Sequence, residues 1–192
     1  MAKGLSAESI TVAAAELIEQ YGRSGFSMRL LADTMGVKTA SLYNHIENMD
    51  TLLTEVCRYA LRMQEDGELR AIAGKTGREA VWALAWAYRR FAQQHRELYW
   101  LVMDTAAGEP RVLDDAAARF TEPLKQVFSG FRLPPREEIH FRRMFRAIVH
   151  GFASQEDEGF FSHYPASTEL SFEFAIQRFI DCVLEAEKRN PS

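Results

Sequence analysis

The run TASLYNH carries side chains that can read nucleic-acid bases. An Asn amide pairs bidentately with adenine, and Ser, Thr, Tyr and His side chains donate hydrogen bonds to phosphates or base edges. On a helical wheel of about 100° per residue, Leu42 and Ile46 fall together, and Ala40, Ser41 and Asn44 fall on the opposite side. Small residues on that side allow a helix to enter the major groove. The run therefore predicts a DNA-reading face and requires no catalytic role.

Two short helices and a tight turn position this run. A first helix is predicted from Met28 to Met35, with Ser27 as its N-cap, and Gly36 stands where the chain reversal needs a left-handed residue. A recognition helix is predicted from Thr39 to Ile46. This order is a helix-turn-helix pattern, in which the second helix contacts bases.

The same segment resembles the DNA-binding domain of the tetracycline-repressor-like (TetR) bacterial regulators. Their pattern, close to Gly-Val-x-x-x-Ser/Thr-Leu-Tyr-x-His-Phe, stands here as Gly36, Val37, Ser41, Leu42, Tyr43, His45 and Ile46. The resemblance implies base contacts just before Leu-Tyr, phosphate contacts by Tyr and His, and one contact from the preceding helix. The resemblance thus points to Arg29, Thr39, Ala40, Ser41, Tyr43, Asn44 and His45, and Ser27 and Lys38 of the same segment complete the expected DNA-binding residues.

The charge of this half is unusual for a DNA-binding domain. Residues 1–50 hold four basic and six acidic side chains, and the whole chain has a net charge of −4. The family usually has a Lys near the start of the fourth helix, where this chain has Met49, and Lys38 is close enough to supply a replacement charge. We therefore expect affinity to depend on a few placed cations, on helix N-termini and on two copies acting together.

Composition predicts an all-α protein with two helical units. The 192 residues exceed the usual single-domain length of about 100 to 150. No run of eighteen apolar residues and no signal-like N-terminus occurs, so we expect a soluble cytoplasmic protein without a membrane segment. Cys57 and Cys182 are isolated, which favours free thiols over a metal site or a disulfide.

Helical periodicity divides the chain into an N-terminal three-helix domain and a larger helical ligand-binding and dimerisation domain, with about nine helices in total. The predicted parts are a DNA-binding domain at 1–48, a connecting helix at 49–66, and the larger domain at 67–192. Further helices are expected around 79–92, 98–103, 112–128, 136–155 and 168–188.

The larger domain holds all three Trp and twelve of the thirteen Phe residues, which favours an enclosed apolar region. Val149, His150 and Gly151 resemble the triplet of a Trp-His-Gly class within the same family, which implies a small-molecule pocket. Any single aromatic residue is also explained by core packing, and Glu156 by a solvated helix end. The expected ligand-binding residues are Trp82, Trp86, His95, Tyr99, Trp100, Met103, Asp104, Phe120, Phe145, His150 and Ser154.

The last two helices show apolar stripes wider than one core face, which favours pairing with a second copy. A two-fold dimer also reads both halves of a near-palindromic operator. The expected interface residues are Phe172, Ile176, Phe179, Ile180 and Val183.

These features predict a repressor that a small apolar or aromatic effector releases from DNA, with no cofactor and no metal. One alternative is a metal-dependent helical-bundle enzyme, because Glu137-x-x-His140 has the spacing of di-iron carboxylate sites. That site requires a second such pair, which the sequence lacks. Another alternative is a helical adaptor that binds proteins through its aromatic surface.

Overall fold

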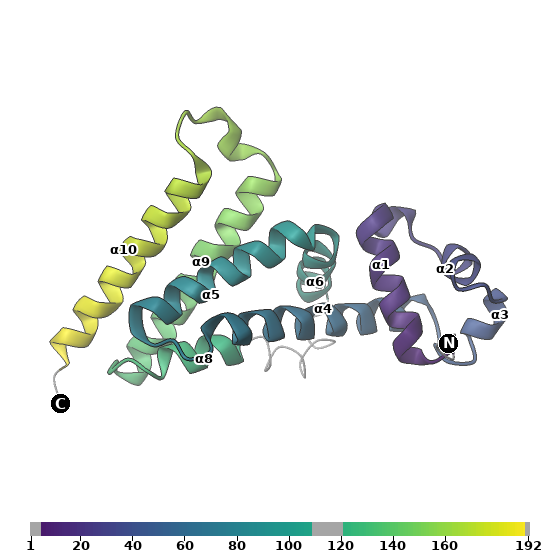
Figure 1. The fold of residues 1–192 in the computed structure, drawn as a ribbon, viewed down its shortest axis with the longest axis horizontal. Helices are drawn as coiled ribbons and strands as arrows, with labels where there is room; N and C mark the ends of the chain where they lie inside the picture. Colours follow the sequence, from purple (N-terminus) through teal and green to yellow (C-terminus); the bar gives the residue numbers. More distant parts are fainter. Residues whose placement is uncertain (1–4, 109–120, 191–192) are drawn as a thin grey trace. The chain divides into compact units, whose positions relative to one another are not determined.

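The computed structural model describes residues 5–108 and 121–190, and within them all regular structure is helical (Figure 1). Phe120 and most of the helix expected at 112–128 lie outside these residues. The elements in chain order are α1 (Ala7–Gly25), α2 (Met28–Met35), α3 (Thr39–Leu42), α4 (Met49–Ile72), α5 (Gly77–Gln94), α6 (Arg96–Gly108), α8 (Glu122–Phe128), α9 (Pro135–Asp157), the 3-10 helix η2 (Phe160–His163) and α10 (Thr168–Arg189). The predicted all-α class is confirmed. None of the helices in the described ranges is long and apolar enough to cross a membrane.

The chain forms two compact units. The first unit comprises the described residues of 1–64 and 95–120, and the second unit comprises those of 65–94 and 121–192. The linear division expected from the sequence differs from this one, because α6 belongs with the N-terminal helices and not with the C-terminal ones. Which earlier helix α6 contacts is a long-range property that sequence order does not state.

The first unit is built around α1, which packs against α2 and α6. Ser6 and Ser9 form a reciprocal capping box, in which each hydroxyl accepts the other residue's N–H at 3.0 to 3.1 Å and so fixes the start of α1. Ile10 and Ile18 are fully buried on its inner face. The helix is kinked at Gly22, which has φ 72° and ψ 165°, and continues beyond it to Gly25.

Helix α4 is longer than the sequence suggested. We expected it to end near Asp66, before a Gly-containing stretch, but it continues through Gly67 to Ile72. The reason is an uninterrupted buried stripe at helical spacing, formed by Leu61, Gln64, Glu68 and Ile72. A single glycine costs a helix only about 1 kcal/mol, which burial of the apolar side chains of Leu61 and Ile72 outweighs.

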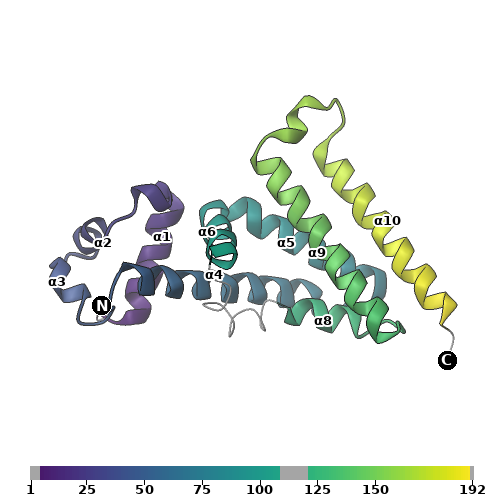
Figure 2. The same cartoon turned by 180° about the vertical axis from the view of Figure 1, so that it is seen from behind.

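The second unit packs α5 against α8, α9 and α10, and α9 against α10 and η2. Figures 1 and 2 show α9 and α10 side by side in opposite directions, joined at one end by η2. Its core contains the rings of Phe128, Phe145 and Phe179, whose centroids lie 5.7 to 6.3 Å apart. Such tilted and edge-on ring packing adds stabilisation beyond the area buried.

Candidate DNA interface and effector region

The turn that positions the recognition segment follows the prediction closely. Ser27 is the N-cap of α2, and its Oγ accepts the Leu30 N–H at 3.1 Å. Gly36 has φ 68° and ψ 30°, the left-handed conformation that favours glycine. The Val37 N–H then bonds the Ala32 carbonyl at 3.0 Å. The reversal between α2 and α3 is thus fixed by local hydrogen bonds.

The recognition helix itself is shorter than expected. It begins at Thr39 as predicted but ends at Leu42, and residues 43–45 form a turn. Ile46 nevertheless donates its N–H to the Leu42 carbonyl at 3.0 Å, which keeps the helical relation between these two side chains. Both are anchors of the unit, with 0% and 4% of their surface exposed.

The side of this segment that turns away from Leu42 and Ile46 faces solvent. Tyr43 is 50% exposed, and Ala40, Asn44 and His45 are exposed as well. Thr39 and Ser41 are half-buried, while Ser27, Arg29 and Lys38 are exposed. The surface that base reading requires is therefore free in the protomer.

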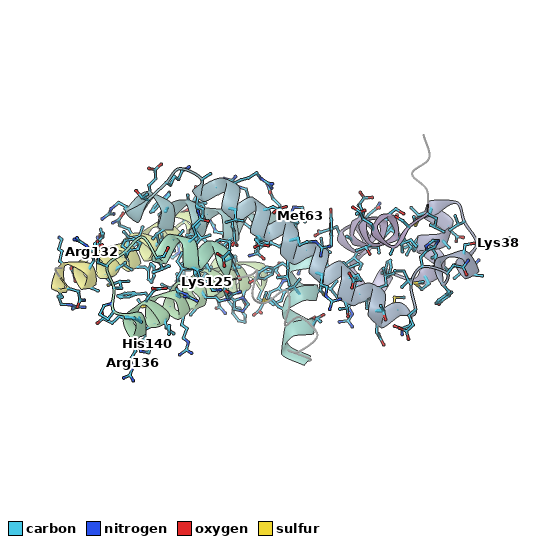
Figure 3. The ribbon with its side chains drawn as sticks, turned by 90° about the horizontal axis from the view of Figure 1, so that it is seen from below. Lys38, Met63, Lys125, Arg132, Arg136 and His140 are labelled. Atoms are coloured by element: carbon cyan, nitrogen blue, oxygen red, sulfur yellow. The ribbon has the colours of Figure 1, made fainter. Side chains whose placement is uncertain are left out.

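Cations are few at this surface. Arg29 lies 3.9 Å from Asp33 with 89% of its side chain exposed, so this pair leaves the guanidinium accessible. Lys38 occupies the N-cap position of α3 and reaches outward from the segment (Figure 3). Met49 is half-buried at the start of α4. The Thr51 N–H bonds Asn48 Oδ1 at 2.8 Å, a cap that the sequence analysis did not assign, although an Asn before a helix is its usual signal.

The expected ligand-binding residues are divided between the two units. His95, Tyr99, Trp100, Met103 and Asp104 belong to the first unit, and Trp82, Trp86, Phe145, His150 and Ser154 belong to the second. Phe120 lies outside the described residues. Sequence order does not show how the helices group, so it cannot divide these residues between two units.

In the first unit, His95 already has a polar partner. Its Nδ1 lies 3.6 Å from Oε1 of Glu19 on α1, and the same oxygen accepts the Leu98 N–H at 3.3 Å. Burial raises the pKa of Glu19, and the bond from Leu98 and the nearby His95 oppose that shift. Tyr99 is buried edge-on against Trp100, whereas Asp104 is exposed.

In the second unit, most of the expected ligand residues are packing residues. Phe145 is buried in the ring cluster of the core. Trp86 packs against Trp82 and edge-on against Phe172, with centroids 6.5 and 5.3 Å apart. Ser154 donates its hydroxyl to Glu158 at 3.2 Å. Half-burial, followed by the charge of a neighbouring Arg, lowers the pKa of His150.

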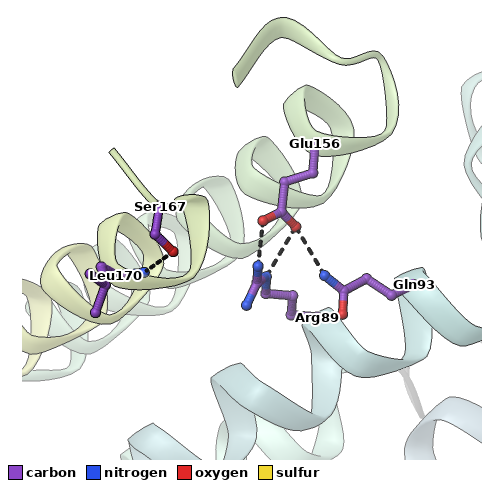
Figure 4. Close-up of polar contacts among 5 residues, drawn as sticks. All are labelled: Arg89, Gln93, Glu156, Ser167 and Leu170. Carbon is purple, nitrogen blue, oxygen red and sulfur yellow. Dashed lines mark hydrogen bonds and ion pairs between the residues drawn. The ribbon is translucent and has the colours of Figure 1, made fainter. Parts of the chain in front are cut away.

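A buried ion pair between α5 and α9 was not predicted. Arg89 donates Nε to Glu156 Oε2 at 3.0 Å and Nη2 to Oε1, and Gln93 adds a bond at 3.3 Å (Figure 4). Only 7% and 15% of the two charged side chains is exposed. The guanidinium also lies 4.9 Å from the Phe172 ring centroid and 5.2 Å from that of Trp86. The interpretation of Glu156 as a solvated helix end is wrong, because its carboxylate bridges two helices.

The five expected interface residues on α10 lie in the protomer's own core. Their exposed fractions are 0% or 1%, so none of them is available to a second copy. The sequence shows how wide an apolar stripe is, but it does not show which part of the stripe faces inward. The exposed apolar side chains of this helix pair are instead Ile139, Met144, Leu170 and Phe174, with 44%, 44%, 64% and 67% of their surface accessible.

Two protein-family models match this chain, one in its N-terminal part and one in its C-terminal part. Residues 10–56 match the family model described as bacterial regulatory proteins, tetR family. Residues 81–179 match the model described as tetracyclin repressor-like, C-terminal domain. The first match covers the helix-turn-helix, and the second begins within α5 and ends within α10. The C-terminal match does not identify a Trp-His-Gly class, so that subclass stays a prediction.

The similarity to other proteins extends over nearly the whole chain. An HTH-type transcriptional regulator of Bacillus subtilis, YobS, is 28% identical over 183 residues, which are 94% of each protein. A solved structure of a Rhodococcus protein of unknown function aligns with a TM-score of 0.79 at 21% identity, covering 94% of this chain and 96% of that one. The structure of a TetR variant from Acinetobacter baumannii in complex with minocycline aligns with a TM-score of 0.69 at 19% identity, covering 98% and 99%. At these identities the two structures are evidence of the fold alone.

Proposed function

We propose, since the chain belongs to the tetracycline repressor family of bacterial regulatory proteins, that it represses transcription and leaves its operator when a small effector binds. Regulators of this family bind DNA, respond to small molecules and form dimers. One observation carries the proposal for this chain. Ala40, Tyr43, Asn44 and His45 are exposed, while Leu42 and Ile46 on the other side of the segment are buried. Action on bacterial DNA assigns the protein to the cytoplasm.

The family and the relatives are transcriptional regulators and not enzymes. The metal-enzyme alternative also has no geometric support in the described residues. Glu137 is half-buried, His140 is exposed, and no group of three or more His, Cys, Asp or Glu side chains in residues 5–108 and 121–190 is arranged to hold a metal ion.

The proposed division of labour at the DNA follows from side-chain type and exposure. Thr39, Ala40, Ser41 and Asn44 are assigned to the bases, because they lie on α3 and in the turn after it, where Ala40 and Asn44 are exposed and Thr39 and Ser41 half-buried. Phosphate contacts are assigned to Ser27, Arg29, Lys38, Tyr43 and His45. The low number of cations predicts a shallow dependence of affinity on salt for each copy.

Dimerisation is assigned to the outer faces of α9 and α10. Ile139, Met144, Leu170 and Phe174 leave apolar surface in water that a second copy of the same pair would cover. Arg136 and His140 project from α9 (Figure 3), are exposed and lie within one helical turn of Ile139 in the sequence, so they would form a polar rim. Two copies would bring two recognition segments to a near-palindromic operator.

The effector is assigned to the helical body and to the apolar or aromatic class. The aromatic residues of the second unit and its half-buried His150 and Ser154 support this assignment. A neighbour in fold, a TetR variant from Acinetobacter baumannii, has been solved in complex with the small molecule minocycline. For the effector to release DNA, it must bind the non-operator conformation more tightly than the operator-bound one.

The test is selection of random double-stranded DNA by the full chain, followed by gel shifts with the selected sequences. We expect an inverted repeat. Asn44→Ala should weaken binding about 10-fold or more, because each good bidentate base contact contributes about 1 to 3 kcal/mol and a dimer loses two. Tyr43→Ala should also weaken binding, whereas Tyr21→Ala, which alters an equally exposed Tyr on α1, should not. Failure to enrich any DNA sequence would favour the adaptor alternative.

A further inference from the structure

A cavity of about 250 Å³ lies in the second unit, lined by residues of α9, of η2 and the loop after it, and of α10. None of the ligand-binding residues expected from the sequence lines it. Its walls are formed by Phe152, Phe161, Tyr164, Ala166, Thr168 and Ser171. Three of these six side chains are aromatic, and three carry hydroxyls, those of Tyr164, Thr168 and Ser171, so the cavity differs from a purely apolar packing defect.

The aromatic wall is held in place from behind. The Phe152 ring lies 5.3 Å from Phe161 at a 54° tilt and 5.3 Å from the fully buried Phe172, edge-on at 77°. Phe172 in turn lies against the guanidinium of Arg89, which Glu156 holds. Because these contacts fix Phe152 before any ligand arrives, binding there does not require that ring to be ordered first.

The turn into η2 brings the second ring to the first. Gly159 has φ 75° and ψ 9°, a left-handed conformation that reverses the chain directly after α9. Because of this reversal, the Phe161 ring of η2 lies back against the Phe152 ring near the end of α9. Tyr164, at the end of η2, is 68% exposed and forms the outer side of the cavity.

The polar side of the cavity offers hydroxyls without charge. Ser167 is already committed as the N-cap of α10, accepting the Leu170 N–H at 3.4 Å (Figure 4). Thr168 and Ser171, which line the cavity, make no side-chain hydrogen bond within the described parts of the chain. Both hydroxyls can therefore donate to or accept from a ligand.

The charges around the cavity disfavour an ionic ligand. No lining residue is charged, so a buried ion would lose hydration without a counter-charge. The N-terminus of α10 would favour an anion, but Glu169 in its first turn already supplies negative charge there. The volume is also below the 300 to 1,000 Å³ or so of pockets that hold drug-sized ligands.

We infer that this cavity binds a neutral, planar aromatic compound of one or two rings that carries a hydroxyl or carbonyl group. The rings would pack between Phe152, Phe161 and Tyr164, and the oxygen would bond Thr168 or Ser171. The binding site is inferred from its own geometry. Only the further step, that its ligand is the effector, rests on the proposed function.

The test is calorimetric titration of the full chain with 2-naphthol, with the anion 2-naphthoate as a comparison. We expect 2-naphthol to bind and 2-naphthoate to bind at least several-fold more weakly. Ala166→Trp, which fills the cavity from an exposed loop position, should abolish binding. Absence of 2-naphthol binding, binding unchanged by Ala166→Trp, or tighter binding of the anion would each overturn the inference.

A second variant keeps the test valid if Ala166→Trp disturbs folding. Thr168→Val with Ser171→Ala removes both hydroxyls with little change of shape, and we expect the Kd for 2-naphthol to rise on the order of tenfold. The same chemical changes at Thr76 and Ser129, which are exposed and outside the cavity, should leave the Kd unchanged. Equal Kd values in the two double variants would contradict the assignment. Gel shifts on the same preparations test the proposed function separately, because loss of regulation does not alter the calorimetric result.

Discussion

The segment from Lys38 to His45 and the bridge between Arg89 and Glu156 differ in what holds them. The recognition segment is fixed by two buried anchors and by hydrogen bonds between residues close in sequence, and its polar side chains face solvent. The bridge joins residues 67 positions apart and is surrounded by aromatic rings. The first region can lose its outward side chains without losing its shape. The second cannot lose either charged partner without leaving the other buried.

This difference separates function from stability in the two regions. Changes on the outward side of the recognition segment should alter DNA binding at nearly constant stability. Changes at the bridge should alter the free energy of unfolding first. Variants that reversed this order would show that the division is wrong.

The largest effect is expected for Arg89→Met. It leaves the Glu156 carboxylate buried with only the weak Gln93 bond, so the free energy of unfolding should fall by about 3 to 5 kcal/mol. Urea denaturation followed by far-UV circular dichroism measures this loss. Replacing both partners, as Arg89→Met with Glu156→Leu, should recover much of it, because no charge is then left unpaired.

The matched control for this variant is Arg78→Met. Arg78 also pairs with a carboxylate, that of Asp181 on α10, at 2.9 Å, but 48% and 30% of these side chains is exposed. We expect a much smaller loss of stability than for Arg89→Met. Equal losses for the two variants would show that burial does not set the contribution of the Arg89 pair.

The next largest effect is expected for Leu42→Ala. Leu42 is fully buried, so removal of its side chain should cost about 2 to 5 kcal/mol of unfolding free energy and should also disturb the recognition segment. Its neighbour Tyr43 is half exposed, and Tyr43→Ala should change stability by less than about 0.5 kcal/mol. Thermal melts and gel shifts of both variants make the comparison. A stable Leu42→Ala protein with normal DNA binding would contradict the anchor role.

The same contrast explains what the sequence could predict. The cap at Ser27, the left-handed Gly36 and the inward Leu42 and Ile46 depend on neighbouring residues, and the structure places them as expected. The length of α4 and the burial of Phe172 depend on which helices pack together. The sequence predicted a shorter α4, and it predicted Phe172 at an interface and not in the protomer's core. No feature of the sequence predicts the Arg89–Glu156 ion pair, since the residues next to each partner do not specify a contact 67 positions away.

A smaller effect is expected for Ser27→Ala. It removes the hydroxyl that accepts the Leu30 N–H, so α2 should lose about 1 kcal/mol of stability. Ser24→Ala, at an exposed serine three residues earlier that caps no helix, is the control. Because Ser27 is also a proposed phosphate contact, DNA binding of the variant should weaken beyond what its stability change explains. Gel shifts at a temperature well below the melting transition separate the two contributions.

The smallest effect concerns the pH dependence contributed by His150. Half-burial on α9 and the nearby Arg146 both lower its pKa, so the unfolded chain binds a proton more readily than the folded protein. His150 therefore contributes no penalty above its ordinary pKa of 6.5, and stability falls as the pH drops from there through the lower folded pKa. His150→Gln should flatten this part of the stability profile, measured by urea denaturation between about pH 7.5 and pH 5. His163→Gln, at an exposed position on η2, should leave the profile as in the wild type, and identical profiles for all three proteins would show that burial of His150 has no energetic consequence.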